Sequence, residues 1–267
     1  MSTMLFPVTT FLSFTIAVFI GPKPETGSQT DLATSLDKLR SPEWTQRASA
    51  AGDIIKVPEN LKSTQIIIGL LDLLDRENRV IDDSFRRGVG TSNEYGEGYG
   101  GYYAALLGTL IKIVDFKNSR TLEILSQGSY NPDSPFAQKL AESGELVVPI
   151  AFQLLQSDIG PKRWNAVSLL GMVYEKRRDH NLPEATAERI KHAIVKTATD
   201  DSNSVARQIA VTFLGRIGTT ADISLLERIA RVDPTSYQRG PELKYPVREA
   251  AVVAINAIRD RSRIQRK

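Results

Sequence analysis

The chain of 267 residues contains no cysteine and only two histidines, His180 and His192. The absence of cysteine excludes disulfide bonds, thiolate metal ligands, a cysteine nucleophile and a lipid-modified N-terminal cysteine. Two histidines are too few for a histidine-rich metal site, and neither a Gly-x-Ser-x-Gly motif nor a phosphate-binding glycine loop is present. We therefore expect no metal and no other cofactor, and the sequence favours binding over catalysis.

A strong excess of charge of one sign is also missing. The formal net charge is +3, the pI is near 9.0, and 41% of the residues are apolar and 24% charged, as is ordinary for a soluble globular protein. Dedicated nucleic-acid binders usually carry a clustered basic face. The charge balance therefore disfavours nucleic acid as the partner.

The N-terminus lacks charge altogether, because residues 2–22 carry no charged side chain and residues 4–20 are mostly apolar. Since a membrane-spanning helix needs about 20 apolar residues, this stretch is short for a full span. We predict that residues 1–30 are a signal peptide or an N-terminal membrane anchor followed by a linker. The protein would then be exported, to the periplasm for instance, or membrane-anchored by residues 4–20. It would be cytoplasmic if that segment is neither, for example a helix that packs on the domain.

Strand-like alternation is scarce beyond residue 30, where apolar residues recur at intervals of three and four. This periodicity predicts helices nearly everywhere. Several of them have recognisable starts, with a serine, asparagine or aspartate as the N-cap or a proline in the first turn. These starts lie at Ser41-Pro42, Pro161, Pro183, Asn203, Asp222 and Pro246.

A phrase recurs along the helical part: Arg, then Ala three residues later, an aliphatic residue at plus seven, often Gly at plus eight, and an aliphatic residue at plus ten. Its arginines lie 44 and 41 residues apart, a period that indicates a helical solenoid with two helices in each unit. The clearest copies are Arg163-Ala166-Leu170-Gly171-Val173, Arg207-Ala210-Leu214-Gly215-Ile217 and Arg248-Ala251-Ile255-Asn256-Ile258. A weaker copy is Arg47-Ala50-Ile54-Val57.

The residue types in the phrase suit a packed helix face. Alanine lets the neighbouring helix approach, the aliphatic residues fill the space between helices, and glycine allows a tight backbone contact. The arginine lies in the first helical turn, where the helix dipole disfavours a cation, so we expect an acidic partner for it. The candidates are Asp158 and Asp200 or Asp201, just upstream in the preceding unit.

The phrase resembles HEAT repeats of the PBS-lyase-like subclass, whose first helix has the pattern V-R-x-x-A-x-x-x-L-G-x-I. The resemblance is clearest at residues 158–260 and implies a right-handed stack of helix pairs used mostly for protein–protein contact. We accordingly predict an all-α fold, a right-handed α-solenoid of about four to five HEAT-like helix pairs. It would cover residues 31–260 and be followed by a basic tail at 261–267.

One segment, residues 86–103, departs from helical composition, because it is rich in glycine and tyrosine. As a binding loop it would use Tyr95 and Tyr99 as contact residues, since tyrosine combines a rigid ring with a polar tip. The alternative is a disordered insertion between two repeats, with Tyr102 and Tyr103 beginning the next helix. For Trp44, near the start of a repeat helix, packing between adjacent units is the favoured interpretation.

Four basic side chains lie on the expected second helices of their units, which usually line the concave surface of such a solenoid. They are candidate contacts for an acidic peptide or a nucleic-acid backbone, although nearby acidic residues dilute their charge. The four are Lys191, His192, Arg228 and Arg231.

We predict from these features a non-enzymatic protein-binding or scaffold module that is exported or membrane-tethered. Its partner would be another protein, with the membrane as a further contact through the N-terminus. Two alternatives stay open: a bilin lyase-like enzyme, which the resemblance offers, and a solenoid that binds nucleic acid.

Overall fold

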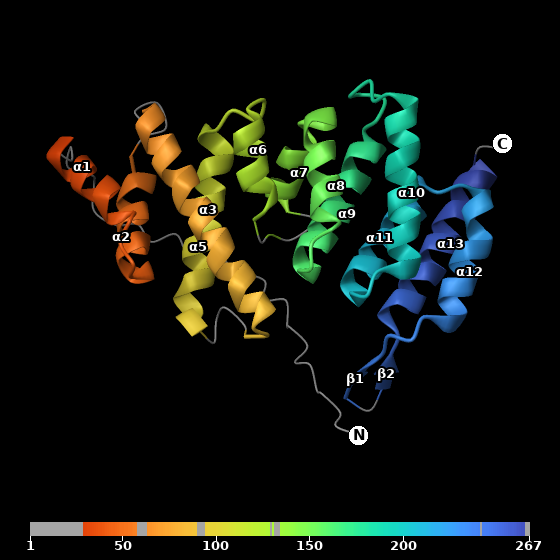
Figure 1. Ribbon diagram of the computed structural model, residues 1–267. Coiled ribbons are helices and arrows are strands. Elements are labelled where there is room, and N and C mark those ends of the chain that lie inside the picture. The colour runs from red at the N-terminus through yellow and green to blue at the C-terminus, as the bar shows by residue number, and fades with distance from the viewer. Residues whose placement is uncertain are drawn as a thin grey trace.

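The computed structural model describes residues 29–57, 63–89, 94–128, 130, 134–240 and 242–264. Within them the chain is almost entirely helical, and the prediction of an all-α solenoid is confirmed (Figure 1). The predicted signal or anchor at residues 4–20 lies outside the described residues, as do 265–267 of the predicted basic tail, whereas 261–264 continue the last helix. The α-helices are α1 (Gln29–Lys38), α2 (Trp44–Ile55), α3 (Thr64–Arg86), α5 (Glu97–Ile113), α6 (Ser119–Ser126), α7 (Pro135–Ala141), α8 (Val148–Leu154), α9 (Gly160–Glu175), α10 (Glu184–Asp200), α11 (Ser204–Ile217), α12 (Ile223–Val232) and α13 (Pro246–Ile264).

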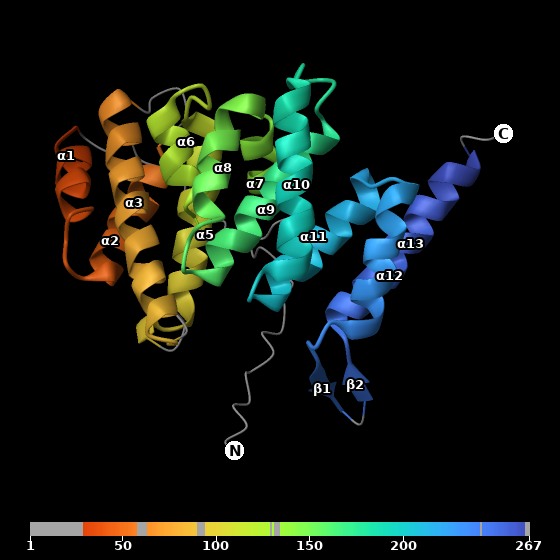
Figure 2. The same ribbon diagram turned by 45° about the vertical axis from the view of Figure 1, so that its right-hand side comes forward.

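The helices form two layers that run along the solenoid. Consecutive members of the first layer contact one another, as α9 contacts α11 and α11 contacts α13. The first layer holds α2, α5, α7, α9, α11 and α13, and the second holds α3, α6, α8, α10 and α12 (Figures 1 and 2). Helix α1 packs beside α2, and two short 3-10 helices, η2 (Gly144–Val147) and η3 (Thr220–Asp222), lie in the connections.

Several predicted helix starts match the structure, but Ser41-Pro42 lies before α2, whose N-cap is Glu43, and Asp222 precedes α12 without a side-chain cap. The side chain of Asn203 accepts hydrogen bonds from the backbone N–H groups of Val205 and Ala206 at 2.9 and 3.1 Å, and so caps α11. Pro161 lies in the first turn of α9, where its missing N–H costs no hydrogen bond, and Pro246 opens α13. These caps fix where each repeat begins and therefore where its arginine lies.

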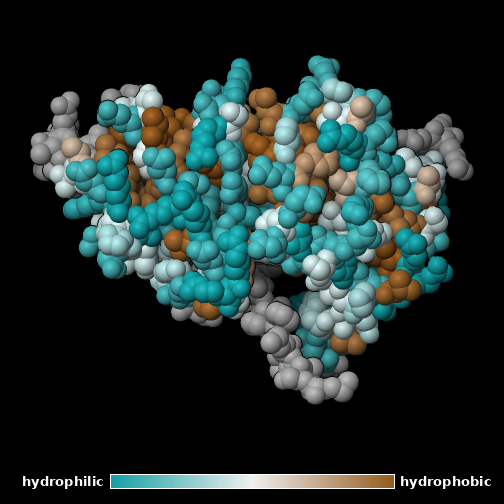
Figure 3. Space-filling model, in the orientation of Figure 1, coloured by the Kyte–Doolittle hydropathy of each residue, from teal (hydrophilic) through white to brown (hydrophobic). Residues whose placement is uncertain are grey.

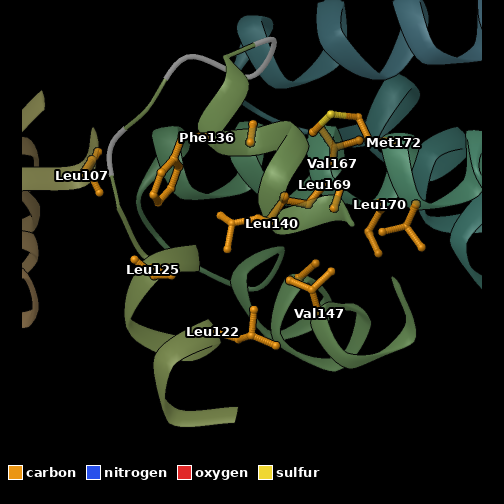
Figure 4. Packing of buried hydrophobic residues seen from close by; sticks show 14 of the residues in the cluster. Leu107, Leu122, Leu125, Phe136, Leu140, Val147, Val167, Leu169, Leu170 and Met172 are labelled. Atoms are coloured by element: carbon orange, nitrogen blue, oxygen red, sulfur yellow. The ribbon is translucent and has the colours of Figure 1, made fainter. Parts of the chain in front are cut away.

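The core is one continuous band of apolar side chains between the two layers. Figure 4 shows its middle part, where Leu122 of α6, Leu140 of α7 and Leu170 of α9 point toward one another, with Val147 beside them. All four are fully buried. Because each unit supplies only part of this band, the units depend on their neighbours for burial of apolar surface.

The first-helix layer is packed too tightly for a side chain at the plus-eight position in two copies of the repeat phrase. A Cβ atom built on Gly171 would lie 2.4 Å from the ring of Phe213, and one on Gly215 would lie 2.9 Å from the Cα of Ala254. The glycine at plus eight is thus the point where α9 meets α11 and where α11 meets α13. The expected role of this glycine in a tight helix contact is confirmed.

We expect Gly215→Ala to destabilise the protein by about 1–3 kcal/mol, because the new methyl group would press against the backbone of Ala254. Gly108→Ala is the matched control, since Gly108 is also helical but has no atom within 4 Å of its added Cβ. It should stabilise by about 0.4–1 kcal/mol through helix propensity alone. Urea unfolding of both variants measures the difference, and the same sign at both positions would contradict the close contact at Gly215.

The repeat arginines join successive units through side-chain and backbone hydrogen bonds. Arg163 donates from Nε and Nη2 to the carboxylate of Asp201 at 2.9–3.2 Å, and from Nη1 to the carbonyl oxygen of Ser157 at 2.8 Å. Arg207 repeats the arrangement: it donates to the carboxylate of Asp233 at 2.8 and 3.2 Å and to the carbonyl oxygen of Asp201 at 2.7 Å. In both cases the carbonyl acceptor lies six residues before the arginine.

These bonds connect into an arginine ladder of Arg163, Asp201, Arg207, Asp233 and Arg248. Each aspartate accepts one arginine on its carboxylate and the next arginine on its carbonyl oxygen, since Arg248 donates to the carbonyl oxygen of Asp233 at 2.6 Å. Burial disfavours ionisation of Asp233, but hydrogen bonds from Arg207 and Thr235 outweigh it and hold its pKa below the usual value. The ladder therefore ties three consecutive units together at one edge of the first-helix layer.

The expected acidic partners of the arginines were upstream, and this expectation is wrong for the carboxylates. Arg163 binds Asp201, 38 residues downstream, and Arg207 binds Asp233, 26 residues downstream. Asp158 instead contacts Arg86 of α3 at 3.1 Å on the surface. Of the predicted upstream acids, Asp201 contacts Arg207 through its backbone carbonyl, because the connection before each first helix turns back over the arginine.

A β-hairpin that the sequence did not predict interrupts the last unit. Its strands, β1 (Tyr237–Arg239) and β2 (Glu242–Lys244), pair antiparallel and project beyond the helical layers (Figures 1 and 2). The hairpin separates Asp233 from Arg248 by 15 residues, against six between Asp201 and Arg207. Arg248 nevertheless donates to the carbonyl oxygen of Asp233, so the inserted hairpin leaves the arginine ladder intact.

Candidate functional site

The second-helix layer contains a groove between α8 and α10, called here the α8–α10 groove. Its volume is about 660 Å³. Hydrophilic side chains cover most of this face of the molecule, with hydrophobic surface visible between them in its upper half (Figure 3). The groove is lined by Phe152, Leu155, Gln156, Glu188, Arg189, His192, Ala193, Lys196, Thr197, Asp200 and Asp201.

Helix α10 supplies one whole wall of the groove. The lining residues of α10 recur in pairs at intervals of four, from Glu188 and Arg189 to Asp200 and Asp201. Residues at this spacing share one face of a helix. The opposite face of the helix carries Ile190 and Ile194, which are fully buried in the core. The amphipathic pattern of α10 therefore presents a mixed polar wall to the groove while it anchors the helix firmly.

The other wall, at the end of α8, places an aromatic ring beside a cation of α10. Phe152 and Leu155, at the end of α8, are only half-buried, so they offer apolar surface to a ligand. The guanidinium of Arg189 lies 5.0 Å from the centroid of the Phe152 ring. Among the described residues Arg189 has no ion-pair partner, and it is exposed. The groove thus provides an apolar platform beside a positive charge that a ligand could neutralise.

The acids at the far end of the groove are compensated. Asp201 is held by Arg163 in the ladder, and Lys196 lies 3.6 Å from Asp200 in an exposed pair. A hydrogen bond from Thr199, with the nearby charges of Lys196 and Arg228, keeps the pKa of Asp200 below its usual value. At the near end Glu188 is exposed and, like Arg189, has no ion pair among the described residues, but Arg189 is the one that lies over the aromatic ring.

The four basic residues predicted as contacts do not form one site. His192 lines the α8–α10 groove and is exposed. Lys191 faces the other side of α10, where its Nζ pairs with Asp222 at 3.2 Å. Arg228 and Arg231 are exposed on α12, outside the groove, and only Arg228 influences it, through Asp200. Of the four, only His192 lines the groove, and neither Arg189 nor Phe152 was among the predicted contacts.

The glycine- and tyrosine-rich segment 86–103 is not a free loop over its described part. Helix α5 begins within it, at Glu97, and Tyr99 is 1% exposed. Both Tyr99 and Tyr102 donate hydrogen bonds to the fully buried carboxylate of Glu77, at 2.7 and 3.1 Å. Burial first, and then the charge of Glu77, raises the pKa of both tyrosines well above the usual value. The prediction of Tyr99 as a contact residue is therefore corrected: its ring and hydroxyl are part of the core.

The same cluster explains the first repeat arginine. Arg47 donates to Glu77 at 2.6 and 3.1 Å, and to the carbonyl oxygen of Ser41, again six residues earlier, at 3.0 Å. Trp44 packs against Tyr99 and Tyr102 with ring centroids 5.6 and 6.3 Å apart, as the packing interpretation of Trp44 predicted. The segment therefore serves to join α2, α3 and α5.

Tyr95, the other predicted contact, is half-buried against the Tyr99 ring, with ring centroids 5.0 Å apart. It lines a smaller hollow of about 450 Å³ together with Arg86, Arg87 and Glu94. Here Arg87 is already bound by Glu94 at 2.7 Å, and Arg86 by Asp158. With its charges paired, this hollow has less to offer a charged ligand than the α8–α10 groove.

The described part of the chain contains no group of three or more histidine or acidic side chains placed to hold a metal ion. No helix in it is both long and apolar enough to cross a bilayer.

No protein-family model matches the chain, and no curated protein matches it. Solved structures that are similar in shape include an engineered protein (TM-score 0.42, 14% identity, covering 86% of this chain and 97% of that one). Another is a computationally designed armadillo repeat protein for modular peptide recognition (TM-score 0.41, 14% identity, 85% and 99% covered). A third is a further designed armadillo repeat protein (TM-score 0.39, 16% identity, 85% and 99% covered). With TM-scores below 0.5, these likenesses carry no conclusion about function.

Proposed function

We propose that this chain is a non-enzymatic protein-binding module that holds a segment of another protein in the α8–α10 groove. The observation that carries the proposal is the pairing of exposed apolar surface on Phe152 and Leu155 with the uncompensated charge of Arg189. Interfaces gain most of their affinity from such a combination of aromatic anchor and arginine. The first-helix layer offers less surface to a partner, because its repeat residues are buried in contacts between helices.

The ligand chemistry follows from the two walls. An apolar side chain of the partner would rest on Phe152 and Leu155, and an acidic side chain beside it would replace water around Arg189. His192 and Ala193, on the α10 wall, would contact the partner's backbone or side chains. The segment can lie along α10, because the groove is open in that direction.

Two further parts of the proposal rest on the sequence. The repeats belong to the PBS-lyase-like subclass of HEAT repeats, since Arg207, Leu214 and Gly215 stand at the positions of its first-helix pattern. Residues 4–20 direct export or anchor the chain to a membrane, where the partner would be met.

Site-specific photo-crosslinking in the native cell tests the groove. A photo-reactive amino acid at His192 should give a discrete crosslinked product, because this position lines the groove and is exposed. The same amino acid at Thr212, exposed on α11 in the other layer, is the matched control and should give none. Arg189→Glu should lower the yield at His192 by about tenfold through charge repulsion of an acidic segment.

Equal products at both positions, or a product at His192 that Arg189→Glu leaves unchanged, would contradict the proposed groove. Mass spectrometry of the captured material identifies the partner and reads the mature N-terminus of this chain. An intact N-terminus in a cytosolic fraction would remove the export and anchor part of the proposal without affecting the groove.

A further inference from the structure

The α10 wall of the groove consists of two rows of side chains, because residues at intervals of four lie on one side of a helix. The inner row holds Arg189, Ala193 and Thr197. The outer row holds Glu188, His192 and Lys196, all of which are exposed. Burial increases along the inner row, since Arg189 is exposed, Ala193 half-buried and Thr197 buried. The two small side chains therefore form a floor of the groove beside Arg189.

The next second helix carries large side chains at the same two positions. Helices α10 and α12 each lead into an aspartate of the arginine ladder, which gives them a common register. The position eight residues before this aspartate holds Ala193 in α10 and Leu225 in α12, and the position four residues before it holds Thr197 and Ile229. Burial agrees with this register, because Ala193 and Leu225 are both half-buried and Thr197 and Ile229 are both buried.

The preceding second helix, α8, also carries large side chains there. Buried positions recur at intervals of four and three in both segments, and they end at Leu154 for α8 and at Thr197 for α10. On this match Ile150, which is half-buried like Ala193, takes the place of the alanine. The connection to the carbonyl group of the ladder is one residue shorter after α8, so burial sets the match here. Of α8, α10 and α12, only α10 therefore has short side chains at both positions.

The short side chains leave apolar space that a partner can fill. In α8 and α12 this space is taken by a leucine and an isoleucine of the unit itself, whereas Ala193 and Thr197 line the open groove, with Phe152 and Leu155 on its other side. A large aliphatic side chain of a partner would bury apolar surface on this floor. We expect it to bind at least about tenfold more tightly than an alanine at the same place.

The charge next to the floor fixes a second feature of the partner. Arg189 precedes Ala193 by four residues, or about 6 Å along the helix axis, and lies in the same row. A similar distance separates residues two apart on one side of an extended segment, or three to four apart on one side of a helix. An acidic residue two to four positions from the aliphatic one would therefore reach Arg189.

The other charges of the groove lie away from the floor. Lys196, in the outer row, pairs with Asp200, and Asp201 is bound by Arg163 at the far end. Glu188, in the outer row beside Arg189, has no ion pair among the described residues, and it disfavours a second acid at this end. The arrangement therefore suits a segment with one acid next to its aliphatic residue.

We propose that the α8–α10 groove selects its partner through one large aliphatic side chain that lies on Ala193 and Thr197, with an acidic residue two to four positions away that reaches Arg189. This inference rests on the proposed function and makes Ala193 and Thr197 its specificity-determining residues. The partner's side chain takes the place that Leu225 and Ile229 take within the unit of α12.

Ala193→Leu, combined with the photo-reactive amino acid at His192, tests the floor. Leucine stands at the matching position of α12, so the variant should fold, as circular dichroism and urea unfolding would show. The crosslinking yield should fall at least about tenfold, because the new side chain fills the floor from within the helix. The matched control is Ala105→Leu, which is exposed on α5 in the other layer and should leave the yield unchanged.

The captured segment gives a second measurement that does not depend on this variant. Its sequence, read by mass spectrometry of the crosslinked peptide, should contain a leucine, isoleucine or methionine with an aspartate or glutamate two to four positions away. As a synthetic peptide, it should bind the unmodified chain at least about tenfold more tightly than the same peptide with alanine for the aliphatic residue. With Ala193→Leu the two peptides should bind equally, because the floor is already filled.

Three results would overturn the inference and leave the groove in place. They are a captured segment without such a pair of residues, equal binding of the two peptides to the unmodified chain, and a yield that Ala193→Leu leaves unchanged while Arg189→Glu lowers it. The absence of any product at His192 in the otherwise unmodified chain would remove the groove and the inference together.

Discussion

Ala210→Asp is expected to abolish cooperative folding of the C-terminal half of the solenoid. Ala210 is the alanine of the repeat phrase in α11 and is fully buried between the layers. An aspartate there would place a carboxylate in the core without a partner, at a cost of more than about 4 kcal/mol, which is a large share of the stability of an ordinary domain. Circular dichroism and urea unfolding measure the loss.

Thr212→Asp is the control for Ala210→Asp, because Thr212 lies two residues away on the exposed side of the same helix. Its hydroxyl donates to the carbonyl oxygen of Gln208 in the preceding turn of the same helix, at 2.9 Å. The exposed carboxylate should change stability by less than about 1 kcal/mol. Similar unfolding curves for both variants would show that the face of α11 assigned to the core has been misplaced.

Arg207→Ala is expected to destabilise the protein by about 3–5 kcal/mol. The side chain is buried, and its removal would leave the buried carboxylate of Asp233 with the hydrogen bond from Thr235 but without its counter-charge, and would remove the donor to the carbonyl oxygen of Asp201. The loss should be read by urea unfolding, together with hydrogen exchange of α11 and α13, since a solenoid can open one unit at a time.

An exposed arginine provides the comparison for Arg207. Arg259 also forms an ion pair, with Glu227 at 2.8 Å, but both side chains of this pair are close to half exposed. Arg259→Ala should cost less than about 1 kcal/mol, because an exposed pair gains little over hydration of the two ions. Equal losses at Arg207 and Arg259 would mean that burial of the ladder contributes nothing.

The repeat phrase predicted the part of the fold that depends on local periodicity. Its alanine and aliphatic positions lie in the core, as Ala166, Leu170, Ala210, Leu214 and Ala251 show, and Ile255 is buried as well. The glycine at plus eight marks the tightest helix contacts. These positions could be predicted because a helix face is set by spacing along the chain and needs no knowledge of the partner helix.

The partners of the arginines could not be predicted in the same way. A first-turn arginine calls for an acid, but the identity of that acid depends on which connection folds back over it. Asp201 and Asp233 hold this place because each begins a turn whose own backbone N–H, at Asn203 and Thr235, binds the same carboxylate. Asp158 and Asp200 are nearer in sequence to the arginines that follow them, but their carboxylates pair with Arg86 and Lys196 instead.

The residues of the α8–α10 groove could not be predicted from the sequence for a related reason. Phe152 and Leu155 belong to a short helix without a strong pattern, and Arg189 is one of several cations on α10. Only the tertiary arrangement shows that the ring and the guanidinium meet across two units. The prediction for Tyr99 was wrong in the opposite sense, because a tyrosine in a segment with the composition of a binding loop here donates to a buried glutamate.

A double-mutant cycle on Arg207 and Asp233 tests most directly whether the repeat arginine ties one unit to the next. The variants are Arg207→Met, Asp233→Leu and the pair together, with the free energy of unfolding measured for each. The arginine ladder predicts a coupling of at least about 2 kcal/mol, with the double variant more stable than the sum of the two single losses implies, because the single variants each leave a buried charge unpaired. Additive losses, with a coupling near zero, would contradict the ladder.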